Sequence, residues 1–295
     1  MLDHRIETFL AVCETMNFTR AAEKLRLTQP AVSQHIRWLE ERYRARLFCY
    51  QGKRLSLTSA GEVLQSTALT MEHDAAYLRK KILHAGERPP APVFGATLTV
   101  ADFALPRHLS QWLRQDGQRT LRMVVGNTSE LLAMLDAGEI DFALVEGYVP
   151  HKAYTSRLFS REEYIAVCGP DFPLPQGPLA LKNLLACRLI LREEGSGTRS
   201  VLEKHLEARG LSVGDFALRV EAGSLHAIKE LAADGCGITF LYRRAARREL
   251  EEGRLRALSL TDLQICHEFR LVFRAGSIFE EEYLQLFRLF KEGGE

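Results

Sequence analysis

The 295-residue sequence predicts an α/β protein in three parts: an N-terminal winged helix-turn-helix, one long linker helix, and a two-lobed α/β domain. Three observations predict this order. Two short helical patterns flank a tight break within 18–40, apolar residues recur in steps of three and four from 64 to 82, and strand and helix patterns alternate from 93 onward. We place the three parts at 1–60, 61–92 and 93–295, with the first lobe at about 93–166 and 269–295 and the second at about 167–268.

The two helical patterns within 18–40 are typical of a helix-turn-helix. Thr19 and Thr28 stand where a side-chain oxygen can cap each helix, and Pro30 lies in the first turn of the second helix, where a missing N–H costs little. The side chains predicted to face inward are Ala21, Ala22 and Leu25 in the first helix and Val32, Ile36 and Leu39 in the second.

The second helix presents polar side chains at its N-terminal half, the part of a recognition helix that meets base edges in the major groove. The predicted DNA-binding residues of this helix are Thr28, Gln29, Pro30, Ala31, Ser33, Gln34 and Arg37. A helical hairpin packed in any globular domain has the same spacing, so periodicity alone leaves both interpretations open. Charge favours the binding of double-stranded DNA, because residues 1–60 carry ten Lys or Arg and six Asp or Glu, whereas residues 93–295 carry 25 and 28.

A basic turn follows the recognition helix and predicts a wing. Gly52, Lys53 and Arg54 lead into a short segment in which apolar and polar residues alternate. Lys53 and Arg54 are therefore predicted to lie beside phosphates, where they add affinity and salt dependence but little sequence preference. A solvated basic turn is equally compatible with these residues.

The linker helix carries a heptad pattern of nearly three repeats. Ser59 and Glu62 have the spacing of a capping box at its start, and a Gly- and Pro-rich segment at 86–92 ends it. The apolar stripe consists of Leu64, Ala68, Met71, Ala75, Leu78 and Ile82. Such spacing favours pairing with a second copy over packing on the same chain, and we expect a homodimer that presents two recognition helices to two half-sites.

From residue 93 onward, strand and helix patterns alternate and predict mostly parallel strands with helices on both faces. Strands are predicted at 97–101, 121–125, 141–145, 188–191, 216–221 and 237–241, and helices at 106–114, 129–137, 199–209 and 225–233. The stretches 163–168 and 269–273 are predicted to cross between the lobes, and 279–290 to form a closing amphipathic helix.

Ligands of open α/β sheets collect beyond the carboxyl ends of the strands, where loops lead into helix N-termini. The loop at 195–199 is the most specific, because its glycines, its hydroxyls and Arg199 suit a carboxylate or phosphate. We expect a polar or anionic small-molecule effector, although helix capping explains these residues equally well, and Asp102 favours a ligand that also carries a donor or amine. The candidate effector-binding residues are Asp102, Phe103, Asn127, Thr128, Ser196, Gly197, Thr198, Arg199 and Ser224.

Several classes of function are disfavoured. No apolar run reaches the roughly 18 residues of a membrane span, and charges interrupt the start of the chain, so we expect a cytoplasmic protein without a membrane partner. Six scattered cysteines and nine histidines show no metal-ligand spacing, and the common nucleotide-binding and catalytic motifs are missing. We therefore predict no metal, cofactor or catalytic residue; the alternative is an enzyme or metabolite store with an N-terminal dimerisation arm.

Taken in order, these motifs resemble the LysR-type transcriptional regulators over essentially the whole chain. The N-terminal match consists of Phe9, Phe18, Ala21, Ala22, Leu25, residues 28–33, Ile36, Leu39, Glu40, Leu47, Phe48, Leu57, Thr58, Ala60 and Gly61. Weaker matches are residues 138–144 and 193–199, Glu221, Gly223, Ser224, Ala232 and residues 235–238. The resemblance implies two periplasmic-binding-protein-like lobes and a metabolite that enters the cleft between them and changes DNA bending. It also implies promoter binding as a dimer of dimers, which is a homotetramer.

Three departures from the family pattern stand out. Tyr43 and Arg44 replace the usual Leu-Gly, so we expect an altered turn after the recognition helix, because Arg adopts a left-handed conformation only at some cost. Tyr50 replaces a usual backbone-contacting Arg, a charge that Arg44, Arg46 or Lys53 would then supply. The segment 102–104 lacks the Ser or Thr that often contacts effectors in the family.

Overall fold

The computed structural model describes residues 3–52, 54–85, 91–175 and 178–292. These residues form two compact units. Unit 1 comprises the described residues within Met1–Pro90, together with Leu135–Glu139 and Arg274–Glu280. Unit 2 comprises the described residues within Ala91–Met134, Ile140–Phe273 and Glu281–Glu295.

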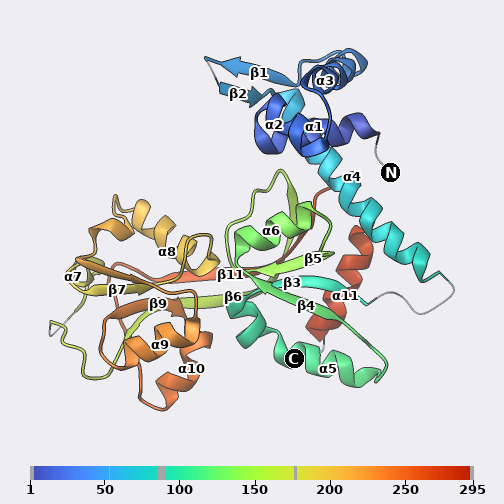
Figure 1. Cartoon of the computed structure of the whole chain (residues 1–295). Coiled ribbons are helices and arrows are strands. Elements are labelled where there is room, and N and C mark those ends of the chain that lie inside the picture. Colours follow the sequence, from blue (N-terminus) through green and yellow to red (C-terminus); the bar gives the residue numbers. More distant parts are fainter. Residues whose placement is uncertain (1–2, 53, 86–90, 176–177, 293–295) are drawn as a thin grey trace. The chain divides into compact units, whose positions relative to one another are not determined.

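Unit 1 contains a winged helix-turn-helix, as predicted, because its small and branched apolar residues recur at helical spacing and meet in one core. The elements are α1 (His4–Thr15), α2 (Phe18–Leu25), α3 (Gln29–Tyr43) and an antiparallel hairpin of β1 (Phe48–Gln51) and β2 (Arg54–Leu57), followed by α4 (Ser59–Leu83) (Figure 1). Apolar side chains from all three short helices meet in the core, among them Phe9, Val12, Ala21, Ala22, Val32, Ile36 and Leu39. Because Val32, Ile36 and Leu39 are buried in this core, the opposite face of α3 is directed toward solvent.

Two helix starts differ from the prediction. The Asn17 side chain caps α2 by accepting hydrogen bonds from the backbone N–H groups of Thr19 and Arg20 (2.9 and 3.1 Å), so Thr19 lies inside the first turn. The cap of α4 is Thr58, whose hydroxyl oxygen accepts from the Gly61 N–H (3.1 Å), and not Ser59. In both cases a neighbouring residue with an equally good capping oxygen holds the extended backbone that a cap requires.

The long helix α4 has two contrasting faces. Along the predicted heptad stripe, Met71, Leu78 and Ile82 are 54%, 44% and 64% exposed. On another face, the Thr70 hydroxyl donates to the Ala275 carbonyl (3.1 Å), and the Asp74 carboxylate accepts from the Ser277 hydroxyl (2.6 Å). The helix therefore packs on its own chain through Leu64 and Ala68, at the start of the stripe, and through polar residues outside it. The later part of the stripe, Met71, Leu78 and Ile82, stays uncovered, so the expectation that the stripe is free to pair with a second copy holds only for this part.

Unit 2 is built on one sheet in the strand order β4-β3-β5-β11-β6-β9-β7-β8, with β10 paired to β6. The pairs β3–β4, β3–β5, β7–β8 and β7–β9 are parallel, whereas β11 with β5, β6 with β9 and β10 with β6 are antiparallel. The strands are β3 (Val93–Thr97), β4 (Arg122–Gly126), β5 (Phe142–Val145), β6 (Tyr154–Cys168), β7 (Arg188–Leu191), β8 (Leu218–Glu221), β9 (Ile238–Tyr242), β10 (Arg256–Leu258) and β11 (Ile265–Arg274).

Two lobes share this sheet, joined by the long strands β6 and β11 (Figure 1). The helices of unit 2 are α5 (Pro106–Gln115), α6 (Thr128–Asp136), α7 (Leu181–Leu184), α8 (Gly197–Glu207), α9 (Leu225–Ala233), α10 (Arg243–Glu251) and α11 (Glu280–Glu292). In the second lobe, α8 lies on one face of the sheet, and α9 and α10 lie on the other (Figure 1). The carboxyl ends of the parallel strands thus lead into loops that begin α6, α8 and α9.

The prediction of the first strand of unit 2, at 97–101, is wrong. The strand ends at Thr97, and Val100–Ala104 is a π-helical turn in which the Leu105 N–H donates to the Val100 carbonyl at 2.9 Å. A short apolar run fits a buried strand and a buried helical turn equally well, and here it continues directly into α5. Asp102 and Phe103 therefore lie on a helical turn and not in an open loop after a strand. Three further elements of unit 2, α7, α10 and β10, were not predicted from the sequence.

Candidate functional site

The start of α3 forms one polar surface of unit 1. Thr28 caps the helix through a hydrogen bond from the Ala31 N–H (3.3 Å), as predicted, and Pro30 lies in the first turn. The turn before it ends α2 at Arg26, which has a left-handed backbone (φ +55°). Because Val32 anchors the other side in the core, the N-terminal half of α3 is directed outward.

Most of the predicted DNA-binding residues on α3 face solvent. Gln29, Pro30, Gln34 and Arg37 are exposed, and Ala31 and Ser33 are partly buried. The Gln29 amide donates to the Ser33 hydroxyl (2.9 Å), which aligns two groups able to reach base edges. A groove of about 700 Å³ is lined by Gln29, Ser33 and Arg37 of α3 together with Asn17 and the wing residue Tyr50. We call α2, α3 and the β1–β2 wing the reading head.

On the reading head, two exposed cations of the described residues are available to phosphates. Arg37 and Arg54 are exposed, and neither has an ion pair with a described residue. Lys53, the other predicted wing contact, lies outside the described residues. Tyr50 is 69% exposed where the family pattern has Arg, and Arg46 is paired with Glu40 (2.8 Å).

The end of α3 keeps the geometry that a glycine would favour. Arg44 adopts a left-handed backbone (φ +52°), and its N–H and that of Ala45 donate to the carbonyls of Glu41 and Glu40. The expected change in this turn is therefore absent: the Arg accepts the strained conformation.

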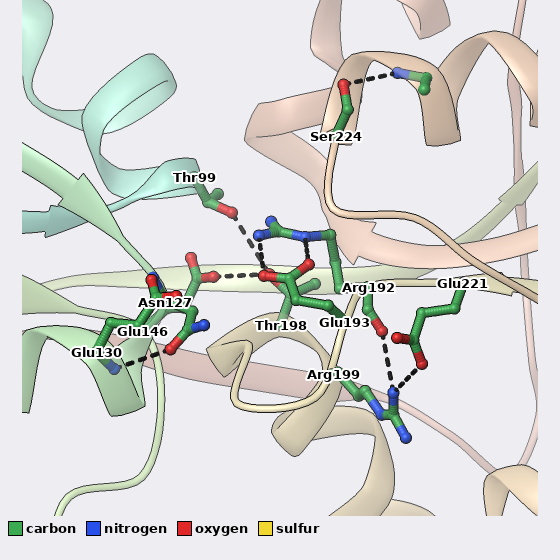
Figure 2. A network of polar contacts seen from close by, with 11 residues as sticks. Thr99, Asn127, Glu130, Glu146, Arg192, Glu193, Thr198, Arg199, Glu221 and Ser224 are labelled. Atoms are coloured by element: carbon green, nitrogen blue, oxygen red, sulfur yellow. Dashed lines mark hydrogen bonds and ion pairs between the residues drawn. The ribbon is translucent and has the colours of Figure 1, made fainter.

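A second polar site lies where the two lobes of unit 2 meet, and its centre is Glu146, directly after β5 (Figure 2). The Thr198 hydroxyl, at the start of α8, donates to Glu146 Oε1 (2.6 Å) and lies 3.5 Å from the Thr99 hydroxyl. The Tyr164 hydroxyl donates to the Thr198 carbonyl (2.8 Å). Burial raises the pKa of Glu146, while the hydroxyl of Thr198 acts in the opposite direction.

Several buried polar atoms at this site have no hydrogen-bond partner among the described residues: Thr128 Oγ1, Glu146 Oε2, Arg192 NH1 and Ser196 Oγ. The four side chains belong to residues that are 1–6% exposed. Buried polar groups in proteins are almost always satisfied, so such a group of unsatisfied atoms needs water or a ligand. We call Thr99, Thr128, Glu146, Arg192, Ser196 and Thr198 the inter-lobe network.

Glycines bring the loops of this network close together. A Cβ at Gly197 would lie 2.6 Å from Glu146 Cγ and 2.8 Å from Thr128 Oγ1, and a Cβ at Gly147 would lie 2.5 Å from the same hydroxyl. Gly197 thus has a packing role that only a glycine can fill.

Arg199 belongs to a different set of contacts (Figure 2). Its guanidinium donates to Glu203 (2.7 Å) and Glu221 (2.7 Å) and to the Arg192 carbonyl (3.3 Å). These contacts hold the start of α8 to the end of β8. They favour the structural interpretation of Arg199 over direct recognition of an anionic effector.

The remaining predicted effector residues divide between capping and packing. Asn127 caps α6 by accepting from the Glu130 N–H (2.9 Å), and Ser224 caps α9 by accepting from the Ala227 N–H (3.3 Å). Phe103 packs against the core of the second lobe, and its ring lies 5.0 Å from the Lys229 ammonium. Asp102 is exposed, although partial burial raises the pKa of its carboxyl.

The sequence analysis missed Glu146, Arg192 and Thr99. Glu146 and Arg192 each follow a buried strand directly, β5 and β7, so their place at the carboxyl end of a strand was the signal that could have found them.

No group of His, Cys, Asp or Glu in the described part of the chain is arranged to hold a metal ion. None of the helices described there has the length and apolar character of a membrane span. All six cysteines are free thiols, and burial raises the pKa of the Cys13 thiol to about 12.

Family models match both parts of the chain. Residues 4–62 match the model described as bacterial regulatory helix-turn-helix protein, lysR family, and residues 93–293 match the LysR substrate binding domain. A RuBisCO operon transcriptional regulator from Acidithiobacillus ferrooxidans is 31% identical over 274 residues, covering 92% of this chain and 88% of the relative.

Solved structures of the same kind share the fold. An OxyR C206 mutant from Corynebacterium glutamicum superposes with a TM-score of 0.60 at 24% identity, covering 98% of this chain and 90% of that one. Full-length LysG from Corynebacterium glutamicum, solved with bound effector Arg, has a TM-score of 0.60 at 18% identity and covers 100% of this chain and 98% of its own.

Proposed function

Because the chain belongs to the LysR family of bacterial transcriptional regulators, we propose that it binds a specific promoter sequence and that a small polar effector between its lobes controls promoter binding or bending. The family consists of DNA-binding regulators and not of enzymes, which removes the alternative of an enzyme or metabolite store. In this proposal residues 1–60 read DNA, 61–92 link and dimerise, and 93–295 sense the effector.

The observation that carries the proposal is the exposed polar face of α3. Thr28, Gln29, Pro30, Ala31, Ser33, Gln34 and Arg37 are the residues we assign to the DNA interface on this helix, with Lys53 and Arg54 on the wing. The hydroxyl and amide side chains among them offer donors and acceptors to bases, and the Arg and Lys side chains offer positive charge to phosphates. In this proposal the protein acts in the cytoplasm.

For the effector, the inter-lobe network is the supporting feature. Thr128, Ser196 and Thr198 are sequence-predicted residues that belong to it, and Gly197 packs against it. A polar molecule that satisfies the unpaired atoms would also bridge residues of two lobes, so it would favour one arrangement of the lobes over others. We assign Asn127, Arg199 and Ser224 to holding the loops that carry this network.

The exposed stripe of α4 supports a homodimer. Met71, Leu78 and Ile82 repeat at heptad spacing and remain uncovered, which is typical of a helix that pairs with a second copy. A homotetramer requires a further interface, which we propose for the effector domains by analogy with the family.

Salt-dependent operator binding tests the proposed function. Fluorescence anisotropy with the full chain compares labelled duplexes from the region upstream of its own gene with a scrambled duplex of the same length. We expect at least about 1,000-fold tighter binding to one upstream duplex, and a steep fall in affinity between 50 and 200 mM salt. Equal affinity for scrambled DNA would contradict a sequence-specific regulator.

A further inference from the structure

The carboxylate of Glu146 is the one anionic group at the centre of the inter-lobe network, and half of it lacks a partner. Its side chain is 1% exposed, and Oε1 accepts from the Thr198 hydroxyl at 2.6 Å. Oε2 is buried without a hydrogen-bond partner among the described residues. An unsatisfied, buried carboxylate oxygen is costly for the folded state and marks a position where a donor is missing.

The nearby guanidiniums do not neutralise this carboxylate by contact (Figure 2). Arg192 donates from Nε and NH2 to both oxygens of Glu193 (2.7 and 2.8 Å), and Arg199 is held by Glu203 and Glu221. Each arginine therefore has its own carboxylate partner on the second lobe. Among the described residues, Glu146 has no ion pair.

One donor of Arg192 remains unused. Its NH1 group is buried without a partner in the described part of the chain, although Nε and NH2 are both engaged. The hydroxyls of Thr128 and Ser196 are also unpaired, and a hydroxyl can donate or accept. The network thus offers one fixed acceptor, one fixed donor and two adaptable groups.

The local charge decides what kind of molecule satisfies these atoms. Of the two charged side chains in the inter-lobe network, Arg192 is already paired with Glu193, whereas Glu146 has no ion pair with a described residue. A plain anion would approach Glu146 against like charge in a buried site, whereas a cation would supply the pairing that this carboxylate lacks.

We propose that the effector is a small zwitterion of the amino-acid class, whose ammonium group donates to Glu146 Oε2 and whose carboxylate accepts from Arg192 NH1. This inference rests on the proposed function, because it names the chemistry of the effector assigned to the inter-lobe network. It replaces the broader expectation of a polar or anionic ligand, and it agrees with the preference for a ligand with an amine that Asp102 indicated. The hydroxyls of Thr128 and Ser196 would complete the hydrogen bonds of the two charged groups.

Matched ligands test the proposal on the full chain. Each of the twenty common L-amino acids is compared with its α-hydroxy acid analogue, as in alanine with lactate and serine with glycerate, and inorganic phosphate serves as a plain anion. Melting-temperature shifts find the binders, and calorimetry gives their Kd values. We expect at least one amino acid to bind about tenfold or more tightly than its hydroxy acid. The reason is that an ammonium group donates a stronger hydrogen bond to the Glu146 carboxylate than a hydroxyl group does.

The substitution Glu146→Gln should weaken binding of that amino acid at least about tenfold while leaving the fold intact. Glu194→Gln is the matched control, because Glu194 lies on the same loop as Ser196 with its side chain 87% exposed, and the substitution removes the same charge outside the network. Its Kd should stay within about twofold of the unmodified chain.

Three results would overturn the inference. They are equal Kd values for Glu146→Gln and the unmodified chain, tighter binding of hydroxy acids or phosphate than of any amino acid, and no binding by any amino acid in the panel. Operator binding measured without added ligand reports separately on the proposed function. A chain that binds its operator and responds to a plain anion would keep the regulator and discard the zwitterion.

Discussion

On the reading head, Gln29, Gln34 and Arg37 face solvent above an apolar core, whereas in the inter-lobe network Glu146 and Arg192 are buried with polar atoms that no described residue satisfies. Exposed polar groups remain hydrated and add little cost to folding, so the reading head is available to a large polyanion at any time. Buried polar groups without partners are costly, and in our proposal a small molecule completes the network. Substitutions on the reading head should therefore weaken DNA binding with little effect on stability. Removal of the Glu146 charge from the network should weaken effector binding and leave the chain at least as stable.

The largest expected effect comes from a negative charge introduced on the reading head. Ser33→Glu places a carboxylate beside Gln29 where bases and phosphates approach, and operator affinity should fall about 1,000-fold, to the non-specific level. Because Ser33 is only partly buried, circular dichroism and melting temperature should stay near those of the unmodified chain. Ser110→Glu, at an exposed serine of α5, is the control and should leave anisotropy titrations unchanged. Normal operator binding by Ser33→Glu would remove α3 from the interface.

The linker helix supplies a third kind of surface, exposed and apolar. Leu78→Lys puts a charge into the heptad stripe, so the dimer should dissociate and operator affinity should fall about 100-fold as two linked half-site contacts become one. Sedimentation velocity at micromolar concentration measures the dissociation. Val63→Lys lies on the same helix outside the stripe, at a side chain that is 67% exposed, and should remain dimeric. A dimeric Leu78→Lys variant would show that α4 does not form the dimer interface.

A smaller effect is expected at the wing. Arg54→Ala removes one exposed cation per subunit, so operator and scrambled duplexes should both lose roughly tenfold in affinity, and the slope of log K against log salt should fall by about 1 per site. Arg107→Ala, an exposed arginine of α5, provides the control. Loss of discrimination between the two duplexes, without a change in slope, would instead assign Arg54 to base recognition.

The smallest expected effect is on the pH dependence of stability, and it arises from the buried carboxyl of Glu146. Because burial raises the pKa of Glu146 above its ordinary 4.5, the folded chain holds this proton more tightly than the unfolded chain. The free energy of unfolding therefore falls as pH rises from the ordinary pKa to the raised one, by about 1.4 kcal/mol per pH unit across that interval. Glu146→Gln should lose this dependence and be at least as stable as the unmodified chain at pH 7. Urea unfolding at several pH values measures the difference, and a destabilised Gln variant would mean that the charged form is already well satisfied.

The two regions also differ in how far the sequence predicts them. The periodicity of Val32, Ile36 and Leu39 fixes which side of α3 is buried, and the exposed side follows by geometry. The π-helical turn at Val100–Ala104 escaped prediction because its short apolar run has no distinctive period.

The polar contacts of the inter-lobe site could not be predicted because they join residues that are far apart in the sequence. Glu146 meets Thr198 across 52 positions, and no local pattern indicates that pair. Part of the structural role of Arg199 is visible in the sequence, because Glu203 stands four residues later on the same helix and predicts an ion pair. Its second partner, Glu221, comes from the end of another strand and required the structure.

Reciprocal coupling between the two regions tests the account most directly. Operator Kd is measured with and without a saturating amino acid from the panel, and the Kd of that amino acid is measured with and without saturating operator duplex. If the inter-lobe network controls the reading head, both affinities change by the same factor, about 5- to 150-fold, since linkage requires the two effects to be equal. Two Kd values that each stay unchanged when the other ligand is bound would contradict control of DNA binding affinity by this site.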